Sequence, residues 1–109
     1  MNNQELQRQI EEGLKIQTDM GKEVIKVALE CIQLFDRKQQ DYGSSNIAIS
    51  GELGIQVRLQ DKVSRMRHLL EKRMREPGMK INNESLDDTY QDVANYGMIG
   101  MLLSRKKWK

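Results

Sequence analysis

The sequence has little of what most enzymes use for covalent or metal chemistry. Its 109 residues include one cysteine, one histidine and one proline. One thiol cannot form a disulfide within the chain, and one histidine cannot build a His/Cys zinc cluster. Walker, GxGxxG and nucleophile–histidine patterns are also missing. These absences argue against a disulfide-stapled scaffold, a structural zinc domain, a P-loop nucleotide hydrolase and a triad hydrolase.

Long hydrophobic runs are missing as well. No apolar run approaches the roughly 20 residues that span a bilayer, and the N-terminal stretch MNNQELQRQ is polar, unlike a signal peptide. Cys31 lies within an apolar helical run, which favours a buried thiol in a reducing compartment. We therefore expect a cytoplasmic protein without a membrane partner.

Aromatic residues are scarce, at 5% of the chain, whereas charged residues reach 31% and hydrophobic residues 38%. A core must then be built from Leu, Ile, Val and Met, and the few β-strand signals argue against a β fold. A net charge of +2 is too small to indicate a nucleic-acid partner. The length suits one domain with a modest core. The sequence therefore predicts a single all-α domain over residues 1–109.

Helical periodicity and turn-forming residues divide this domain into a bundle of three long helices plus an N-terminal helix. We predict an N-terminal helical extension over residues 1–20, with Thr18 or Asp19 as the cap of the next helix, and a core bundle over residues 22–104. The breaks in that bundle are a Gly/Ser/Asn-rich loop and a Pro-Gly pair. The predicted long helices cover 22–40, 50–76 and 86–104, with Ser85 as the last cap, and a frayed basic tail follows at 105–109.

The narrow first helix and the exposed apolar stripes need a partner, which predicts association with other copies. Leu6, Ile10 and Leu14 form a narrow stripe on the first helix, which buries too little apolar surface to dock alone. The helix over 22–40 is apolar on more than one face, so we expect it to be the most buried one. Helices in so small a domain gain burial by association, and we therefore predict a homo-oligomer.

The helix over 50–76 carries a cationic face. Arg58, Asp61, Lys62 and Arg65 are three and four residues apart, and Asp61 is one turn from both arginines. Two interpretations stay open. This is either a salt-bridged face exposed to solvent or an anion cradle in which Asp61 orients the three cations toward a phosphate.

The last helix carries an acidic and amide face. Asp88, Asp92 and Asn95 follow one another at steps of four and three, next to Tyr96. Carboxylates one helical turn apart suit Mg²⁺, which takes one or two protein carboxylates and fills its shell with phosphate and water. Arginines bind phosphate with two parallel hydrogen bonds. If the two faces meet, they suit a nucleoside phosphate with its metal; the alternative is a salt-bridge network, which is costly to bury.

The loop between the first two long helices offers further groups. Lys38, Tyr42 and Ser44 would close the site from the loop, and Tyr42 or Tyr96 would stack on a base. A plain connector explains the same Gly and Ser residues. Among the base- or ribose-binding candidates we therefore place Tyr42, Ser44, Asn95 and Tyr96, with Asp88 and Asp92 as the metal ligands.

Three blocks in order carry a resemblance to a known family. Lys38 with Asp41-Tyr42-Gly43, then Arg58-x-x-Asp61-Lys62-x-x-Arg65, then Asp88-x-x-x-Asp92-x-x-Asn95-Tyr96 resemble the small all-helical nucleotide modification associated domain, type 1, of phage and bacterial genomes. The resemblance covers residues 24–103. It implies a role in phage nucleotide metabolism or DNA modification, and a location in the host cytoplasm if the chain is phage-encoded.

A weaker resemblance is to the MazG-like all-α nucleoside triphosphate pyrophosphatases, which hold Mg²⁺ between helices with ExxE and ExxD motifs. This chain departs from that pattern. Asp88 and Asp92 are four residues apart instead of three, and Glu30 with Gln33 stands where two glutamates are needed.

The leading hypothesis is therefore recognition of a phosphorylated nucleotide or a nucleotide-derived small molecule, with Arg58, Lys62, Arg65 and Lys38 on the phosphate. If the protein is an enzyme, the residues suit a Mg²⁺-dependent nucleotide phosphohydrolase or phosphotransferase. One alternative is a non-catalytic sponge that sequesters a host defence signal nucleotide. The other is a structural or host-interaction protein whose charged faces are only salt bridges.

Overall fold

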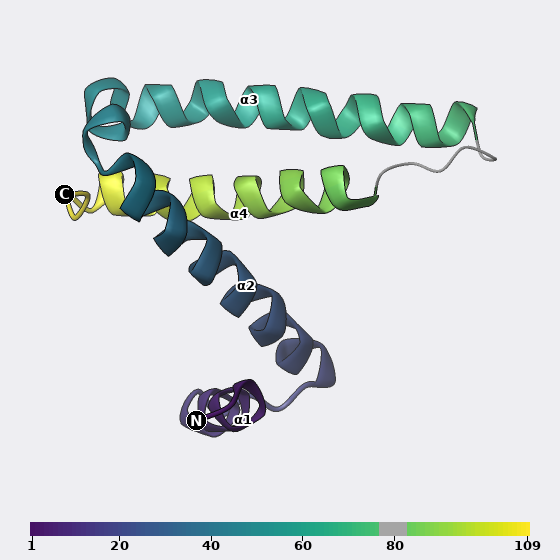
Figure 1. The fold of residues 1–109 in the computed structure, drawn as a ribbon, viewed down its shortest axis with the longest axis vertical. Coiled ribbons are helices and arrows are strands. Elements are labelled where there is room, and N and C mark those ends of the chain that lie inside the picture. Colours follow the sequence, from purple (N-terminus) through teal and green to yellow (C-terminus); the bar gives the residue numbers. More distant parts are fainter. Residues whose placement is uncertain (77–82) are drawn as a thin grey trace. The chain divides into compact units, whose positions relative to one another are not determined.

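The fold is all-α, as the sequence predicts. A computed structural model describes residues 1–76 and 83–109, and within them the ordered elements are helices and turns, without a strand. The helices are α1 (Asn3–Gly13), α2 (Asp19–Tyr42), α3 (Ser45–Arg75) and α4 (Asn83–Ser104) (Figure 1). Among the described residues, no helix combines the length and apolar composition needed to cross a bilayer.

The chain divides into two compact units, Met1–Lys38 and Gln39–Lys109. Helix α2 contributes residues to both units. The prediction of a single domain over the whole chain stays a prediction.

In the first unit, the boundaries of the helices follow from capping. Asn2 caps α1 by accepting a hydrogen bond from the Glu5 backbone N–H at 2.8 Å. Lys15 has a left-handed φ of 57°, and bonds from Lys15 N to Glu12 O and from Ile16 N to Glu11 O close a Schellman turn. This turn ends α1 well before residue 20, the predicted end of the extension.

The start of α2 confirms the predicted cap. The Thr18 hydroxyl accepts from the Gly21 N–H at 2.9 Å, and the helix begins at Asp19. Gln7 of α1 donates to the Lys22 carbonyl at 3.1 Å, which ties α1 to the first turn of α2. The predicted burial of α2 is wrong: Ile25 and Cys31 are buried, but Val24, Val27 and Ile32 are each more than half exposed.

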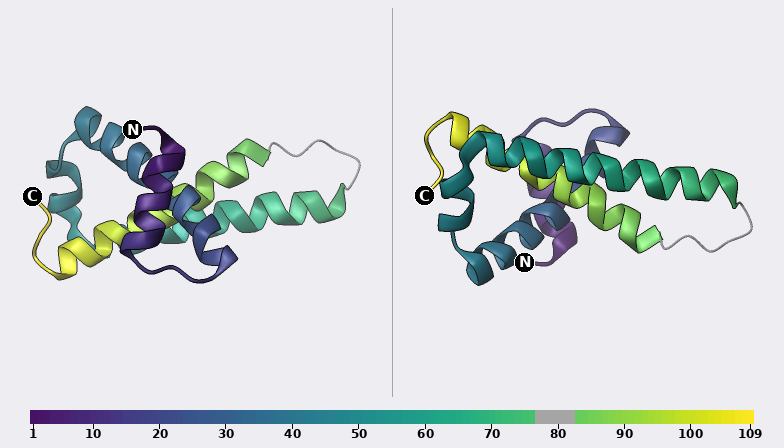
Figure 2. Two further views of the ribbon diagram at one scale, coloured as in Figure 1. Left: turned by 90° about the horizontal axis from the view of Figure 1, so that it is seen from below. Right: turned by 90° about the horizontal axis from the view of Figure 1, so that it is seen from above.

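The second unit is built on α3 and α4, which run antiparallel and lie side by side in all three views of the ribbon (Figures 1 and 2). Its buried residues are Ile55 on α3 and Leu86, Thr89, Asn95 and Ile99 on α4. A Cβ atom added to Gly100 would lie 3.8 Å from Ile55 Cγ2, so α3 packs against α4 at this glycine.

The buried side of α4 runs through Leu86, Thr89, Asn95 and Ile99. Tyr90 and Met101 lie off this side and are about half exposed, and a Cβ atom added to Gly97 would meet nothing within 4 Å.

The α2–α3 loop and the first part of α3 each contain a glycine with a positive φ. Gly43 has φ 68° and donates to the Gln39 carbonyl at 2.9 Å, which ends α2. Helix α3 then begins at Ser45, earlier than the predicted Ser50, but Gly51 (φ 60°, ψ −152°) interrupts its helical geometry. The predicted start therefore corresponds to this kink. α3 ends at Arg75, as predicted within one residue, whereas Pro77-Gly78 lies outside the described residues.

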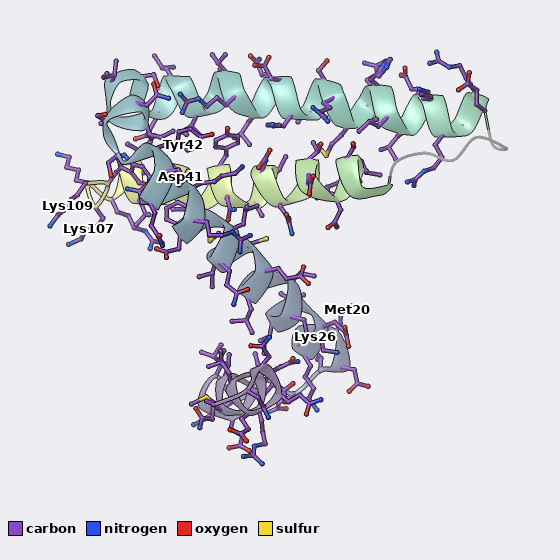
Figure 3. The ribbon with its side chains drawn as sticks, in the orientation of Figure 1. Met20, Lys26, Asp41, Tyr42, Lys107 and Lys109 are labelled. Atoms are coloured by element: carbon purple, nitrogen blue, oxygen red, sulfur yellow. The ribbon has the colours of Figure 1, made fainter. Side chains whose placement is uncertain are left out.

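The C-terminal tail is held against the α2–α3 loop, which corrects the prediction of a frayed end. A Schellman turn at Lys106 (φ 57°) reverses the chain after α4, with Lys106 N bonded to Leu103 O and Lys107 N to Leu102 O. Trp108 Nε1 then donates to the Ser44 carbonyl at 3.0 Å, and the Ser44 hydroxyl donates to the Lys109 carbonyl. The labelled side chains of Lys107 and Lys109 project from this end of the molecule (Figure 3).

The start of α4 also lies earlier than predicted. The helix begins at Asn83, so Ser85 lies inside it instead of capping it. The Ser85 carbonyl accepts from the Thr89 hydroxyl at 2.7 Å. This bond satisfies the hydroxyl of Thr89, which is only 2% exposed.

Candidate functional site

The cationic face of α3 borders a cavity in the second unit. Arg58, Asp61, Lys62 and Arg65 line it from α3, and Tyr96 lines it from α4; its volume is about 360 Å³. The i, i+3 and i+4 spacing of the α3 residues puts them on one side of the helix, so a single straight segment presents all four. Three cations and one carboxylate thus form the α3 wall of a cavity that also has an aromatic ring from α4.

An ion pair joins the two helices beside this cavity. Lys62 Nζ lies 2.8 Å from Asp92 Oδ2, and the two side chains are only 26% and 16% exposed. Partial removal from water strengthens the attraction between these charges. The pair confirms that the cationic side of α3 and the aspartate side of α4 face each other, and it gives Lys62 a partner in the absence of any ligand.

Among the described residues of the same helix pair, three buried polar atoms have no hydrogen-bond partner. They are Nη1 of Arg58 and both amide atoms, Nδ2 and Oδ1, of Asn95. Asn95 is 6% exposed, so solvent water has little access to hydrogen-bond its amide. Buried polar atoms in folded proteins are nearly always paired, and each unpaired one costs about 1–3 kcal/mol. A polar ligand or a bound water that reached these atoms would remove that cost.

Most of the predicted site residues on α3 and α4 lie at the cavity or beside it. Asp92 is paired with Lys62, and Asn95 is buried on the same helix as Asp92. The residues that line the cavity are Arg58, Asp61, Lys62, Arg65 and Tyr96.

The predicted site residues in and before the loop have other surroundings. Tyr42 is 76% exposed. The Ser44 hydroxyl accepts a hydrogen bond from Gln39 Nε2 and donates one to the C-terminal tail. Lys38 belongs to the first unit and not to the unit that contains the cavity.

The predicted metal ligands lie on one side of α4. Asp88 is exposed and Asp92, one turn further on, is held by Lys62. Among the described residues, no group of three or more His, Cys, Asp or Glu side chains is placed to hold a metal ion. Mg²⁺ often binds through only one or two protein carboxylates, so Asp88 and Asp92 stay predicted ligands and not an assigned site.

Two residues of this unit were not singled out by the sequence. The bond of Trp108 to Ser44 joins residues 64 positions apart, for which no local pattern exists. The burial of Thr89 follows from its place between Leu86 and Ile99 on the contact side of α4, and a strict 3.6-residue period would have indicated it.

The comparisons with known proteins give one family. The family model described as nucleotide modification associated domain 1 matches residues 38–103, which is more than half of the chain. No curated protein and no solved structure matches the chain, and the resemblance to MazG-like pyrophosphatases has no further support. The matched span contains every residue that lines the cavity and begins one residue before the second unit. The chain therefore belongs to the nucleotide modification associated domain 1 family.

Proposed function

We propose that the cavity between α3 and α4 binds the phosphate of a nucleotide. The observation that carries this proposal is the grouping of Arg58, Lys62 and Arg65 around one cavity, with a buried Arg58 nitrogen that has no partner. Guanidinium groups match phosphate oxygens with two parallel hydrogen bonds, and a phosphate supplies the acceptor that Arg58 lacks. The membership in a nucleotide modification associated family supports the choice of a nucleotide among phosphorylated ligands.

Each residue then has a stated role. Arg58 and Arg65 bind the phosphate, and Lys62 shifts from Asp92 to a phosphate oxygen when the ligand enters. Asp61, on the same wall, orients the arginines. Tyr96, which lines the cavity, stacks on the base.

Thermal-shift screening followed by calorimetry tests this proposal. The panel contains deoxynucleoside and ribonucleoside mono-, di- and triphosphates, with inorganic phosphate as the minimal ligand. A ligand at a hundredfold excess over its Kd stabilises the folded state by about 3 kcal/mol, which gives a clear rise in Tm. No rise with any nucleotide would contradict the proposal.

The matched variants are Arg65→Gln and Arg75→Gln. Both remove one arginine from α3 with the same change in net charge, but only Arg65 lines the cavity, and both side chains are exposed. A charged hydrogen bond is worth about 1.5–3 kcal/mol, so Arg65→Gln should weaken binding by about 10- to 100-fold. Arg75→Gln should leave the Kd unchanged. Equal losses in both variants would indicate only general attraction between unlike charges.

The same samples separate catalysis from sequestration. Each nucleotide that binds is incubated with the protein, with and without Mg²⁺, and analysed by chromatography after the protein is denatured. New products that need Mg²⁺ support a phosphohydrolase or phosphotransferase with Asp88 and Asp92 as metal ligands. Unchanged nucleotide supports a sponge. A structural role is supported if Arg58→Ala and Asp92→Ala lower Tm while no nucleotide raises it.

A further inference from the structure

The C-terminal tail concentrates positive charge that the net charge of the chain does not reveal. From Val93 to Lys109 the sequence contains no acidic residue. The net charge of the whole chain is only +2, because acidic residues elsewhere cancel most of the cations. We name the four exposed cations of this stretch the tail patch; they are Arg105, Lys106, Lys107 and Lys109. The tail patch is therefore a local cationic surface on a nearly neutral protein.

The protein itself does not neutralise the tail patch. Within residues 1–76 and 83–109, none of its four side chains forms an ion pair. Cations at the C-terminal end of a helix stabilise the helix dipole, which accounts for Arg105 and Lys106 next to the end of α4. That effect falls off within one turn, so it does not account for Lys107 and Lys109, which follow the reversal of the chain at Lys106.

The tail holds these cations in a fixed arrangement. Trp108 Nε1 donates to the Ser44 carbonyl at 3.0 Å, and the Ser44 hydroxyl donates to the Lys109 carbonyl. Fixing a chain segment costs conformational entropy, and like charges held close together repel each other. A tail that served only solubility would avoid both costs if it stayed free. An ordered group of unpaired cations instead suits a partner with many negative charges.

We propose that the tail patch binds the phosphate backbone of a single-stranded nucleic acid, and that Tyr42 stacks on one of its bases. The backbone is a regular row of single negative charges, and cations that bind it release its counterions. Tyr42 is 76% exposed and lies two residues before the serine that holds the tail. Figure 3 labels Tyr42, Lys107 and Lys109 at the same end of the second unit, where the four cations outnumber the labelled carboxylate of Asp41. Aromatic rings beside such cations stack on unpaired bases.

A lipid surface fits the tail patch less well. Binding to the surface of a bilayer needs apolar side chains that insert beside the cations. Trp108, the large apolar side chain of the tail, is half-buried and bonded to the loop. The tail patch also lies beyond residue 103, where the family match ends, and none of its residues lines the cavity. This site therefore stands or falls independently of nucleotide binding in the cavity.

Fluorescence anisotropy of the full chain with a labelled oligothymidylate tests the proposal. Each phosphate contact to a single strand contributes about −0.7 to the slope of log affinity against log salt. Four contacts should therefore weaken binding about 50-fold between about 50 and 200 mM salt. The absence of binding at the lower salt concentration would overturn the proposal. Binding to phosphatidylserine vesicles without binding to the oligonucleotide would overturn it in favour of a membrane surface.

Matched pairs of substitutions identify the residues that bind the backbone. Lys107→Gln with Lys109→Gln should weaken binding at the lower salt at least about tenfold and reduce the salt effect to about sevenfold, because two contacts remain. Lys72→Gln with Arg75→Gln makes the same change in charge at exposed positions of α3 and should leave the affinity nearly unchanged. The tail pair should also leave the Kd of a mononucleotide unchanged. Equal losses in the two pairs, or an oligoglutamate that competes as well as the oligonucleotide, would overturn the proposal.

The stacking role of Tyr42 has its own control. Tyr42→Ala should weaken binding of the single strand about 5- to 100-fold, which is the usual effect of losing one aromatic ring from such a site. Tyr90→Ala removes a ring that is 49% exposed on α4 and should have no effect. A duplex that competes as well as the single strand would overturn the assignment to unpaired bases.

Discussion

At the scale of single residues, two roles are open to Asp92 on α4, and they lead to different predictions for nucleotide binding. As a metal ligand it would support binding of a metal–nucleotide complex. As the partner of Lys62 at 2.8 Å it competes with any phosphate for that ammonium group. Both roles cannot dominate at once, because a carboxylate that holds Lys62 presents less free charge to a cation.

We predict that Asp92→Asn tightens binding of metal-free nucleotide while it lowers stability. The change releases Lys62 for the phosphate and removes one negative charge beside the cavity. It also leaves a lysine that is only 26% exposed without its partner, which should cost about 1–3 kcal/mol and lower Tm. Calorimetry in the presence of a chelator measures the first effect and thermal unfolding the second.

The control for this variant is Asp87→Asn, which makes the same substitution at an exposed position of α4. It should change neither Kd nor Tm. If Asp92→Asn instead weakens binding, and only when Mg²⁺ is present, Asp92 acts as a metal ligand.

At the scale of secondary structure, the C-terminal tail of the second unit is hydrogen-bonded to the α2–α3 loop. Trp108 bonds the Ser44 carbonyl at 3.0 Å, and the Ser44 hydroxyl is shared between Gln39 and Lys109. The C-terminal tail, which is distant in sequence, therefore meets the last turn of α2 and the adjacent loop at one serine. Ser44 is thus a structural residue in this arrangement, which separates it from the predicted role in the nucleotide site.

We predict that Trp108→Phe weakens the contact between the tail and the α2–α3 loop and leaves the cavity unchanged. Phenylalanine keeps most of the apolar surface but has no N–H group for the Ser44 carbonyl. The loss of one hydrogen bond should lower the free energy of unfolding by about 1 kcal/mol and speed amide exchange in residues 39–46. Exchange in α3 around Lys62 should not change.

Lys107→Gln is the matched tail variant, because its exposed side chain changes while the backbone bond to Leu102 is kept. It should leave exchange as in the wild type. If Trp108→Phe has no effect on residues 39–46, the tail does not hold the loop in solution.

The boundaries of the helices could be predicted where a nearby residue caps or ends the helix. Thr18 caps α2, Gly43 ends it, and α3 ends at Arg75, two positions before a proline in the sequence. Other limits have no such signal: Lys15 and Lys106 adopt the left-handed conformation that glycine normally takes at a helix end. The proximity of Lys62 and Asp92 was predicted from charge and spacing, whereas the burial of Asn95 and the tail bond depend on contacts that only the folded chain defines.

At the scale of the whole molecule, two independent divisions of the chain coincide. The second compact unit begins at Gln39, and the family match begins at residue 38. The cavity residues, the Lys62–Asp92 pair and the tail closure all lie within the second unit. Apart from residue 38, the segment that the family model matches and the candidate site thus both lie in the second unit.

We therefore predict that a fragment of residues 39–109 folds and binds the same nucleotides as the full chain. A chain of this size seldom gains more than about 3–5 kcal/mol from its core, so its Tm should lie below that of the full protein. Circular dichroism measures folding and calorimetry measures binding, with Arg65→Gln in the fragment as the negative control. A helical fragment that does not bind would show that Lys38 or earlier residues complete the site. An unfolded fragment would show that the two units fold only together.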